Sequence, residues 1–514
     1  MNDRTLLYVA VLLTVASVTY WTAYAFNAFY TFHEYDDLGA YAYAMWYDIH
    51  YPGIVHGLQF IVFGNHIAPD QLMVLPIFYL WQSPLSLLFV QSVVVGITCF
   101  SAFLIARRLL NDSKLAFLVF LALLINPGLN GLNIFDYHCE LFLVIFSVLT
   151  FYFFMQRRTA FFLLFLVLLL FVQEAAAFVA AGLGLGLLIY GLFYSESKKY
   201  HVKMSIVLLL AAILAFAFYH IVTSALMNAY ASGAYPSLPP KFKVIPYYSE
   251  QLGNTAGTLA GSLHPFELLF VPAFYLKYLV YGIIVVFLFL GTAVLFDPIL
   301  TVLLASPWLT EVFLLNNFSF VVSWDYYMVF GLSGTVIGGI IGLMLMKERK
   351  GVLAKLIARY RKDDYEAFTR KLAYYSISFM IFFFVVTYPF FVYSKNVNNI
   401  GQDLLFQVSP QIRAIDEQLY SVMTLVPRNS SLMTDYFIMS HFTNRRYLEE
   451  FGNSTIYFVP KYILFDFNLN ISLNGYSSVP FVIQYLQTHK YALYARNGTA
   501  YLLVLANNST SQIP

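Results

Sequence analysis

The stretch TLLYVAVLLTVASVTYWTAYAFNAF, residues 5–29, contains no charged side chain and is followed closely by HEYDDLGAYAYAMW, residues 33–46. About 20 consecutive apolar residues are enough for a helix to cross the hydrocarbon core of a bilayer. The first stretch is longer than the apolar core of a typical signal peptide and lacks a small-residue cleavage site, so we predict a retained transmembrane helix. The acidic segment then begins where the chain leaves the membrane.

The rest of the chain has the same character. Of its 514 residues, 60% are hydrophobic and only 11% are charged, whereas roughly 25% of a soluble domain is charged. We predict an α-helical polytopic membrane protein with about eleven transmembrane helices. The predicted spans lie near residues 5–27, 85–105, 115–127, 139–155, 159–172, 175–195, 203–223, 270–291, 293–310, 326–346 and 373–394.

Lys and Arg alternate along the predicted connections. Residues 28–83 contain none, whereas nine lie between Lys347 and Lys371. Cytoplasmic connections of membrane proteins carry the excess of Lys and Arg. We therefore predict a multi-pass plasma-membrane protein with a cytoplasmic N-terminus, and the odd number of spans places the C-terminus outside.

Two domains are expected. Residues 1–395 form the transmembrane domain, with an acidic first extracytoplasmic loop at 28–83, and residues 396–514 form a small extracytoplasmic α/β domain. In the latter, a helix is predicted from Ser409-Pro410 and strands near 431–437, 462–467 and a hairpin around Asn497-Gly498. Its N-x-S/T sequons, with only two cysteines in the chain, fit an archaeal plasma membrane, and a bacterial inner membrane is the alternative. The sequons are Asn429, Asn453, Asn470, Asn497, Asn507 and Asn508.

Acidic and histidine residues gather at the predicted outer ends of the spans. Asp36 and Asp37 are paired carboxylates beside the membrane, where desolvation costs several kcal/mol unless a cation or donor satisfies them. His66 follows in FGNHIAPDQ. Asp36 and Asp37 are candidate catalytic residues. The alternative interpretation is that they only begin a solvent-exposed loop.

Asp136, His138 and Glu140 alternate with apolar residues in NIFDYHCELF. Two carboxylates and an imidazole suit a divalent metal, and oxygen-rich ligands favour Mg²⁺ or Mn²⁺, although His138 also admits Zn²⁺. The alternative interpretation is that these acids only stabilise the start of a helix, because negative charge interacts favourably with the dipole at a helix N-terminus.

Several short motifs carry a resemblance to a known family, over most of the chain. They are Asp37-Leu38-Gly39 with Trp46, Gly64-Asn65-His66 with Pro69, Asn126-Pro127, Asp136-x-His138-x-Glu140, Glu174-Ala175, and in the tail SHFTNRR (440–446) and KYILFDF (461–467). At these residues the chain resembles a family of bacterial and archaeal membrane proteins, domain of unknown function 2079. Asn65 and Ala175 stand where that family has acids.

That family is similar to the GT-C membrane glycosyltransferases. The resemblance implies transfer of a sugar from a polyprenyl-phosphate carrier to an extracytoplasmic glycan or protein, with membrane lipid as a partner and no nucleic acid. Asp37 is then the candidate base, with Asp36 and His66 beside it, and Asp136, His138 and Glu140 are the metal ligands. The expected substrate-binding residues are Lys241, Lys243, Glu174, Asp325 and Tyr327. A non-catalytic envelope or glycan-assembly scaffold and a lipid or solute transporter are the competing classes.

Overall fold

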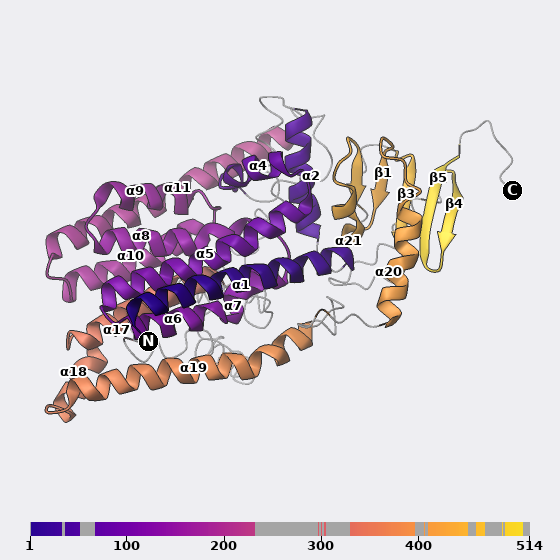
Figure 1. Cartoon of the computed structure of the whole chain (residues 1–514). Helices are drawn as coiled ribbons and strands as arrows, with labels where there is room; N and C mark the ends of the chain where they lie inside the picture. The colour runs from indigo at the N-terminus through magenta and orange to yellow at the C-terminus, as the bar shows by residue number, and fades with distance from the viewer. Residues whose placement is uncertain are drawn as a thin grey trace, which may run out of the picture.

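The computed structural model describes residues 2–32, 36–51, 67–231, 329–395, 410–450, 459–467 and 489–506, with residues 297, 300, 303–304, 406 and 486. Within these residues the chain forms a bundle of long helices with a small β-sheet beside one end (Figure 1). We call this the sheet end, and the opposite end, near the N-terminus, the far end. The helices of the bundle are α1 (Asp3–Tyr30), α2 (Asp36–His50), α4 (Gln71–Leu80), α5 (Pro84–Leu110), α6 (Ser113–Leu124), α7 (Pro127–Ile134), α8 (Leu143–Met155), α9 (Thr159–Leu170), α10 (Ala176–Phe193), α11 (Lys198–Ala231), α17 (Val329–Lys347), α18 (Val352–Tyr360) and α19 (Tyr365–Lys395).

Seven helical segments among the described residues are long and apolar enough to cross a membrane, and three shorter ones are also apolar. This confirms the predicted membrane-spanning character. The predicted spans at 270–291 and 293–310 lie almost wholly outside the described residues, so the total of about eleven stays a prediction, as does the orientation of the termini.

Close helix packing explains one of the glycines in the bundle. α1 packs along α5, and a Cβ on Gly96 would lie only 2.5 Å from Cγ2 of Val18. Since lipid tails are as apolar as the helices, membrane helices gain little from hydrophobicity and depend on such close contact between backbones. Gly96 therefore permits the approach of these two helices.

The region predicted as the first loop contains helices. α2 and α4 lie within it, and the middle of α2 is buried at every position from Tyr41 to Met45. The acidic pair stands at the N-terminus of α2, where negative charge favours the helix dipole.

The tail is built around a five-stranded sheet of order β2-β1-β3-β5-β4. β1 pairs in parallel with β2 and β3, whereas β3, β5 and β4 pair antiparallel. The hairpin predicted at Asn497-Gly498 is confirmed, and Gly498 adopts a φ of +56° at its turn. The elements are α20 (Pro410–Met423), β1 (Leu432–Thr434), α21 (Tyr436–Met439), the 3₁₀ turn η4 (Ser440–Phe442), β2 (Leu448–Glu450), β3 (Tyr462–Asp466), β4 (Tyr491–Asn497) and β5 (Ala500–Leu505).

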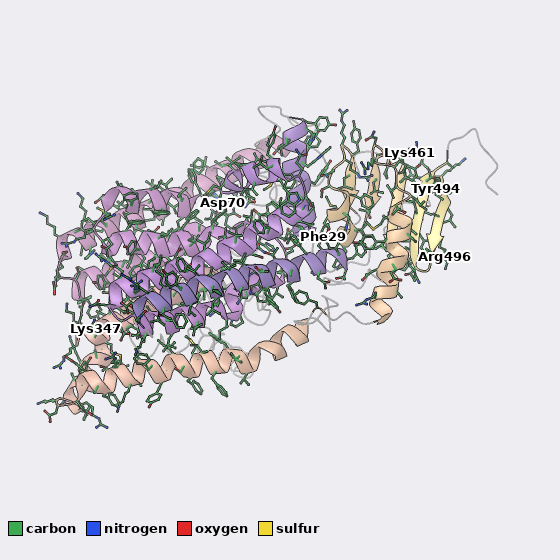
Figure 2. The ribbon with its side chains drawn as sticks, viewed as in Figure 1. Phe29, Asp70, Lys347, Lys461, Tyr494 and Arg496 are labelled. Carbon is green, nitrogen blue, oxygen red and sulfur yellow. The ribbon has the colours of Figure 1, made fainter. Side chains whose placement is uncertain are left out.

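The tail packs directly on the sheet end of the bundle. Phe32 and Tyr43 are buried in the same apolar cluster as the tail's own core. The Tyr43 hydroxyl donates to the carbonyl of Arg446 at 2.9 Å. Nε2 of His441 lies 3.0 Å from the backbone carbonyl oxygen of Phe29, and the imidazole stacks on the phenyl ring of Phe29. Figure 2 shows Phe29 at this junction. Burial lowers the pKa of His441 to about 4, so a neutral imidazole donates this bond.

The buried carboxyl of Asp416 on α20 predicts a pH dependence for the tail. Burial, and then the charge of Asp466, raises the pKa of Asp416 to about 8. An unfolded chain loses this proton near pH 4, so between about pH 4 and 8 the folded tail binds more protons than the unfolded tail. Its stability should therefore fall as the pH rises through this window, with the full cost present above about pH 8.

Asp416→Asn is expected to remove this pH dependence and to stabilise the tail at pH 8 by up to about 5 kcal/mol. Hydrogen exchange of the β3 and β5 amides in the full chain, corrected for intrinsic rates and compared at pH 5 and pH 8, measures both effects. Equal pH slopes in the two proteins would contradict the assignment.

Candidate metal centre

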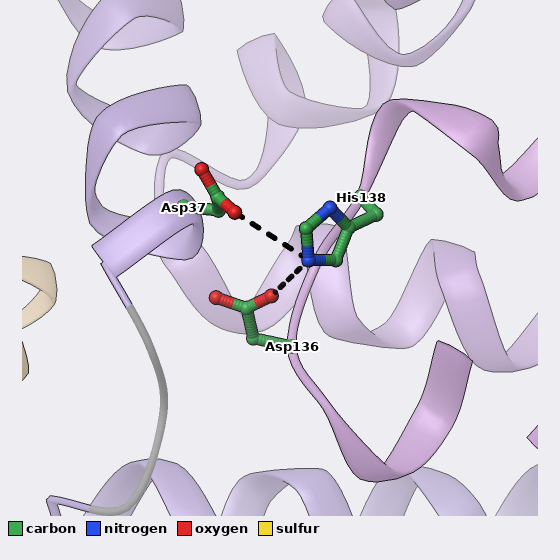
Figure 3. A group of neighbouring side chains, drawn as sticks. All are labelled: Asp37, Asp136 and His138. Carbon is green, nitrogen blue, oxygen red and sulfur yellow. Dashed lines mark ion pairs between the residues drawn. The ribbon is translucent and has the colours of Figure 1, made fainter. Parts of the chain in front are cut away.

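Three side chains from distant parts of the sequence meet at the sheet end of the bundle. Asp37 lies in the first turn of α2, and Asp136 and His138 lie in the extended segment after α7 (Figure 3). Nε2 of His138 is 2.9 Å from Oδ1 of Asp136 and 3.5 Å from Oδ2 of Asp37. One ligand atom from each residue lies within 4.8 Å of the others, which is close enough for a single ion to bind all three.

A glutamine from α5 holds the extended segment in place. The Gln91 side-chain amide donates to the carbonyls of Leu132 and Asp136, and its oxygen accepts the backbone N–H of His138 at 3.0 Å. Because a buried backbone group without a partner is costly, one side chain that satisfies three of them fixes this irregular stretch.

Asp136 joins the segment to α2. Its Oδ2 accepts the backbone N–H of Leu38 at 3.1 Å, which is one of the helix N-terminal groups that lack an intrahelical partner. The same carboxylate therefore contacts the imidazole with one oxygen and holds the start of α2 with the other, which places Asp37 next to His138.

Glu140 was predicted as a metal ligand, and the structure places it on the opposite side of the imidazole. Its Oε2 is 3.7 Å from Nδ1 of His138, and its Oε1 accepts a hydrogen bond from Gln173 at 3.0 Å. A carboxylate on the second ring nitrogen is the common outer partner of a metal-binding histidine, because it fixes the ring orientation and tautomer. The group of side chains close enough to hold an ion therefore contains Asp37 with Asp136 and His138, and a direct ligand role for Glu140 stays a prediction.

The centre is buried and rich in negative charge. The side chains of Asp136, Glu140 and His138 are 0%, 1% and 3% exposed, and that of Asp37 is 20% exposed. Burial by itself lowers the pKa of His138, but the carboxylates of Asp136, Asp37 and Glu140 outweigh it and raise the pKa to about 9. Three carboxylates around one imidazole leave an excess of negative charge, which a divalent cation would balance.

The donors fit a small divalent cation. Two carboxylate oxygens and one imidazole nitrogen are compatible with Mg²⁺, Mn²⁺ or Zn²⁺. Mg²⁺ generally keeps several waters and takes only one or two carboxylates from the protein, with substrate phosphate completing its shell. Three protein donors would leave coordination positions of such an ion open to water or other ligands.

Other predicted residues have different surroundings. Oε2 of Glu174 accepts the backbone N–H of Ile67 at 3.0 Å, so this carboxylate holds the chain that leads into α4. In the SHFTNRR motif of the tail, Arg445 donates to the carbonyls of Phe442 and Ser430 and is buried. The predictions for His66, Lys241, Lys243, Asp325, Tyr327 and the side chain of Asp36 lie outside what the structure describes.

Gln91 and Gln173 are the residues of the site that sequence reasoning missed. Both are buried, and Gln91 stands within the predicted apolar span 85–105. A polar side chain inside a membrane span is expensive and tends to have a specific partner. The position of Gln91 in an apolar span could therefore have marked it as a candidate, whereas its hydrogen-bond partners are visible only in the structure.

The matched family is described as a predicted membrane protein (DUF2079), and the match covers residues 33–474. The chain belongs to this family. The match includes Asp37, Asp136 and His138 and extends through β3, whereas β4 and β5 follow its end. No curated protein matches the chain. The resemblance to this family is thereby confirmed, and the similarity to GT-C enzymes stays a prediction.

Proposed function

We propose that this protein is a metal-assisted membrane glycosyltransferase that takes a sugar from a polyprenyl-phosphate carrier. The observation that carries the proposal is the meeting of Asp37, Asp136 and His138 at one end of an apolar helix bundle. A lipid-linked phosphate sugar holds its reactive bond beside the membrane, where such a centre would meet it. The acceptor would be an extracytoplasmic glycan or protein.

Transfer of a sugar from a lipid phosphate requires compensation of the charge on the departing phosphate. The segments that form the centre contain no Lys or Arg between residues 28 and 83 or between 127 and 138. A divalent cation bound by Asp136 and His138 would supply that positive charge. Glu140, which faces Nδ1 of His138, would keep the imidazole oriented so that Nε2 can bind the cation.

Asp37 is the member of the centre that a substrate could reach, because its side chain is the most exposed of the three. In the proposed reaction Asp136 and His138 would hold the cation and Asp37 would stay outside its coordination shell, so that the Asp37 carboxylate accepts the proton of the acceptor hydroxyl. The hydroxyl oxygen forms a bond to the anomeric carbon, while the bond from that carbon to the phosphate oxygen breaks and the carrier retains the phosphate. A positioned general base typically contributes a factor of about 10² to 10⁴ in rate.

Asp37→Asn is therefore expected to reduce sugar transfer at least about 100-fold and to leave the lipid-linked donor unused. Mass spectrometry of cell-surface glycans and lipid-linked sugars, in cells with the gene, without it and with the variant, measures both. Asp364→Asn, which changes an exposed carboxylate at the far end, is the matched control.

Two outcomes would contradict the proposal. If the variant reaches the membrane and the glycans are unchanged while gene deletion alters them, the protein acts as a scaffold. If deletion instead alters the distribution of an intact lipid or solute across the membrane and no glycan, the protein is a transporter.

A further inference from the structure

The short helix α18 lies between α17 and α19 at the far end of the bundle (Figure 1). α17 ends at Lys347, and the chain turns through Gly351, whose φ of +89° favours glycine, before α18 begins. α19 then starts at Tyr365. One candidate membrane span runs from Val329 to Tyr360 and the next from Tyr365 to Val386, so α18 forms the last part of the first span, after the turn at Gly351 and just before the second begins.

The two faces of α18 have different surroundings. Leu353, Ala354 and Ile357 face the bundle, where Ala354 is fully buried and the other two pack on the main apolar cluster. Val352, Leu356 and Tyr360 follow each other at four-residue spacing and are 51%, 52% and 75% exposed. They form an apolar stripe that points away from the protein.

Two cations flank this stripe. Lys355 and Arg359 are exposed, and at 100° per residue they stand on the edge of the outward face next to Val352 and Leu356. Other cations at this end pair with acids: Arg349 with Glu366 at 3.8 Å, Lys350 with Glu348 at 2.9 Å, and Arg361 with Asp364 at 3.7 Å. Within the part of the chain that the structure describes, Lys355 and Arg359 form no such ion pair.

We propose that α18 is an interfacial helix that binds anionic phospholipid in the leaflet at the far end. Val352, Leu356 and Tyr360 enter the boundary between headgroups and acyl chains, and Lys355 and Arg359 bind lipid phosphate. An amphipathic helix with cations beside its apolar face has the composition that favours this location. Because α18 is joined to α17 and α19, both of which lie in candidate membrane spans, its outward face is held close to the bilayer. Lipid is therefore the nearest partner for that face. This inference is independent of the proposed enzymatic function.

A fluorophore on α18 tests the proposal in the full-length protein. Leu356→Cys places a thiol on the outward face, while both native cysteines are buried. The labelled protein is reconstituted in nanodiscs of phosphatidylcholine with a small fraction of spin-labelled phosphatidylglycerol or spin-labelled phosphatidylcholine. We expect quenching by both lipids, and stronger quenching by the anionic one.

The preference for anionic lipid should depend on the two cations. Lys355→Gln and Arg359→Gln are each expected to lower the relative association of phosphatidylglycerol roughly fivefold. Arg361→Gln, which removes a charge already paired with Asp364, should leave it nearly unchanged. A fluorophore that remains in water and unquenched in both nanodiscs would overturn the proposal and leave an acidic protein segment as the partner to seek. Quenching without lipid preference would overturn the assignment of the cations.

Discussion

Replacing His138 by alanine is expected to abolish binding of a divalent cation by the purified protein. The imidazole lies between Asp37 and Asp136 and is the only nitrogen ligand of this group. Without it, only the carboxylates of Asp37 and Asp136 remain in the group. We expect the affinity for Mn²⁺ to fall more than about 100-fold, which exceeds the usual effect of losing an outer partner.

Substitutions of His138 and Glu140 should weaken Mn²⁺ binding to different degrees, because His138 is the proposed direct ligand and Glu140 contacts only its second ring nitrogen. Glu140→Gln keeps the shape of the side chain but removes the negative charge that faces Nδ1 of His138, so the affinity for Mn²⁺ should fall about 10- to 100-fold. His220→Ala, at an exposed histidine of α11, is the control. Isothermal titration calorimetry on chelator-treated protein measures the Mn²⁺ affinity of His138→Ala, Glu140→Gln and His220→Ala.

The metal assignment fails if the wild-type protein binds no divalent cation at millimolar concentration, or if His138→Ala binds Mn²⁺ as tightly as the wild type. Hydrogen exchange of α7 and α8 in the variants shows whether the bundle is intact. That control is needed because removal of one partner from a buried charged group can cost about 3 to 5 kcal/mol.

Gly39→Val is expected to separate the tail from α2 and to weaken the metal centre at a distance. A Cβ at this position would meet the backbone nitrogen of Ser440 at 3.2 Å and the side chain of Met439 at 3.4 Å. The Ser440 nitrogen belongs to the backbone and cannot move away alone, so the two added methyl groups of valine require the tail to shift. Overpacking of this kind costs about 1 to 3 kcal/mol.

The start of α2 should respond to that shift. Asp37 is two residues away, and the Leu38 N–H is the group that Asp136 holds. We expect at least tenfold faster hydrogen exchange in α21 and β1 and roughly tenfold weaker Mn²⁺ binding. Ala40→Val, one residue further along α2 at a half-buried position, introduces the same side chain and is the matched control. Wild-type exchange rates in Gly39→Val would show that the tail does not rest on this glycine.

The candidate site was partly visible in the sequence. Asp136 and His138 are two residues apart, so any extended backbone keeps them close, and their type indicated a metal. Asp37 is about a hundred residues away in the chain, and its approach depends on the bond from the Leu38 N–H to Asp136. The side of the imidazole on which Glu140 lies was not visible in the sequence, because alternation along the chain does not specify which ring nitrogen a carboxylate faces; its role as a metal ligand stays a prediction.

The role of Gly39 shows the same limit. The family motif Asp-Leu-Gly drew attention to its acid, whereas the glycine is explained by a contact with Ser440, some four hundred residues further on. A local pattern cannot reveal a contact between segments so far apart.

The sequence by itself determined that this chain lies in a membrane, because the length and apolarity of its helices are properties of consecutive residues. It also determined the turn of the last hairpin, because Asn497-Gly498 encodes a local backbone geometry. Only the tertiary structure decided that Asp37 joins Asp136 and His138, and that the tail rests on α2. Both arrangements depend on contacts between helix ends and distant segments, and their energies arise only once the chain is packed.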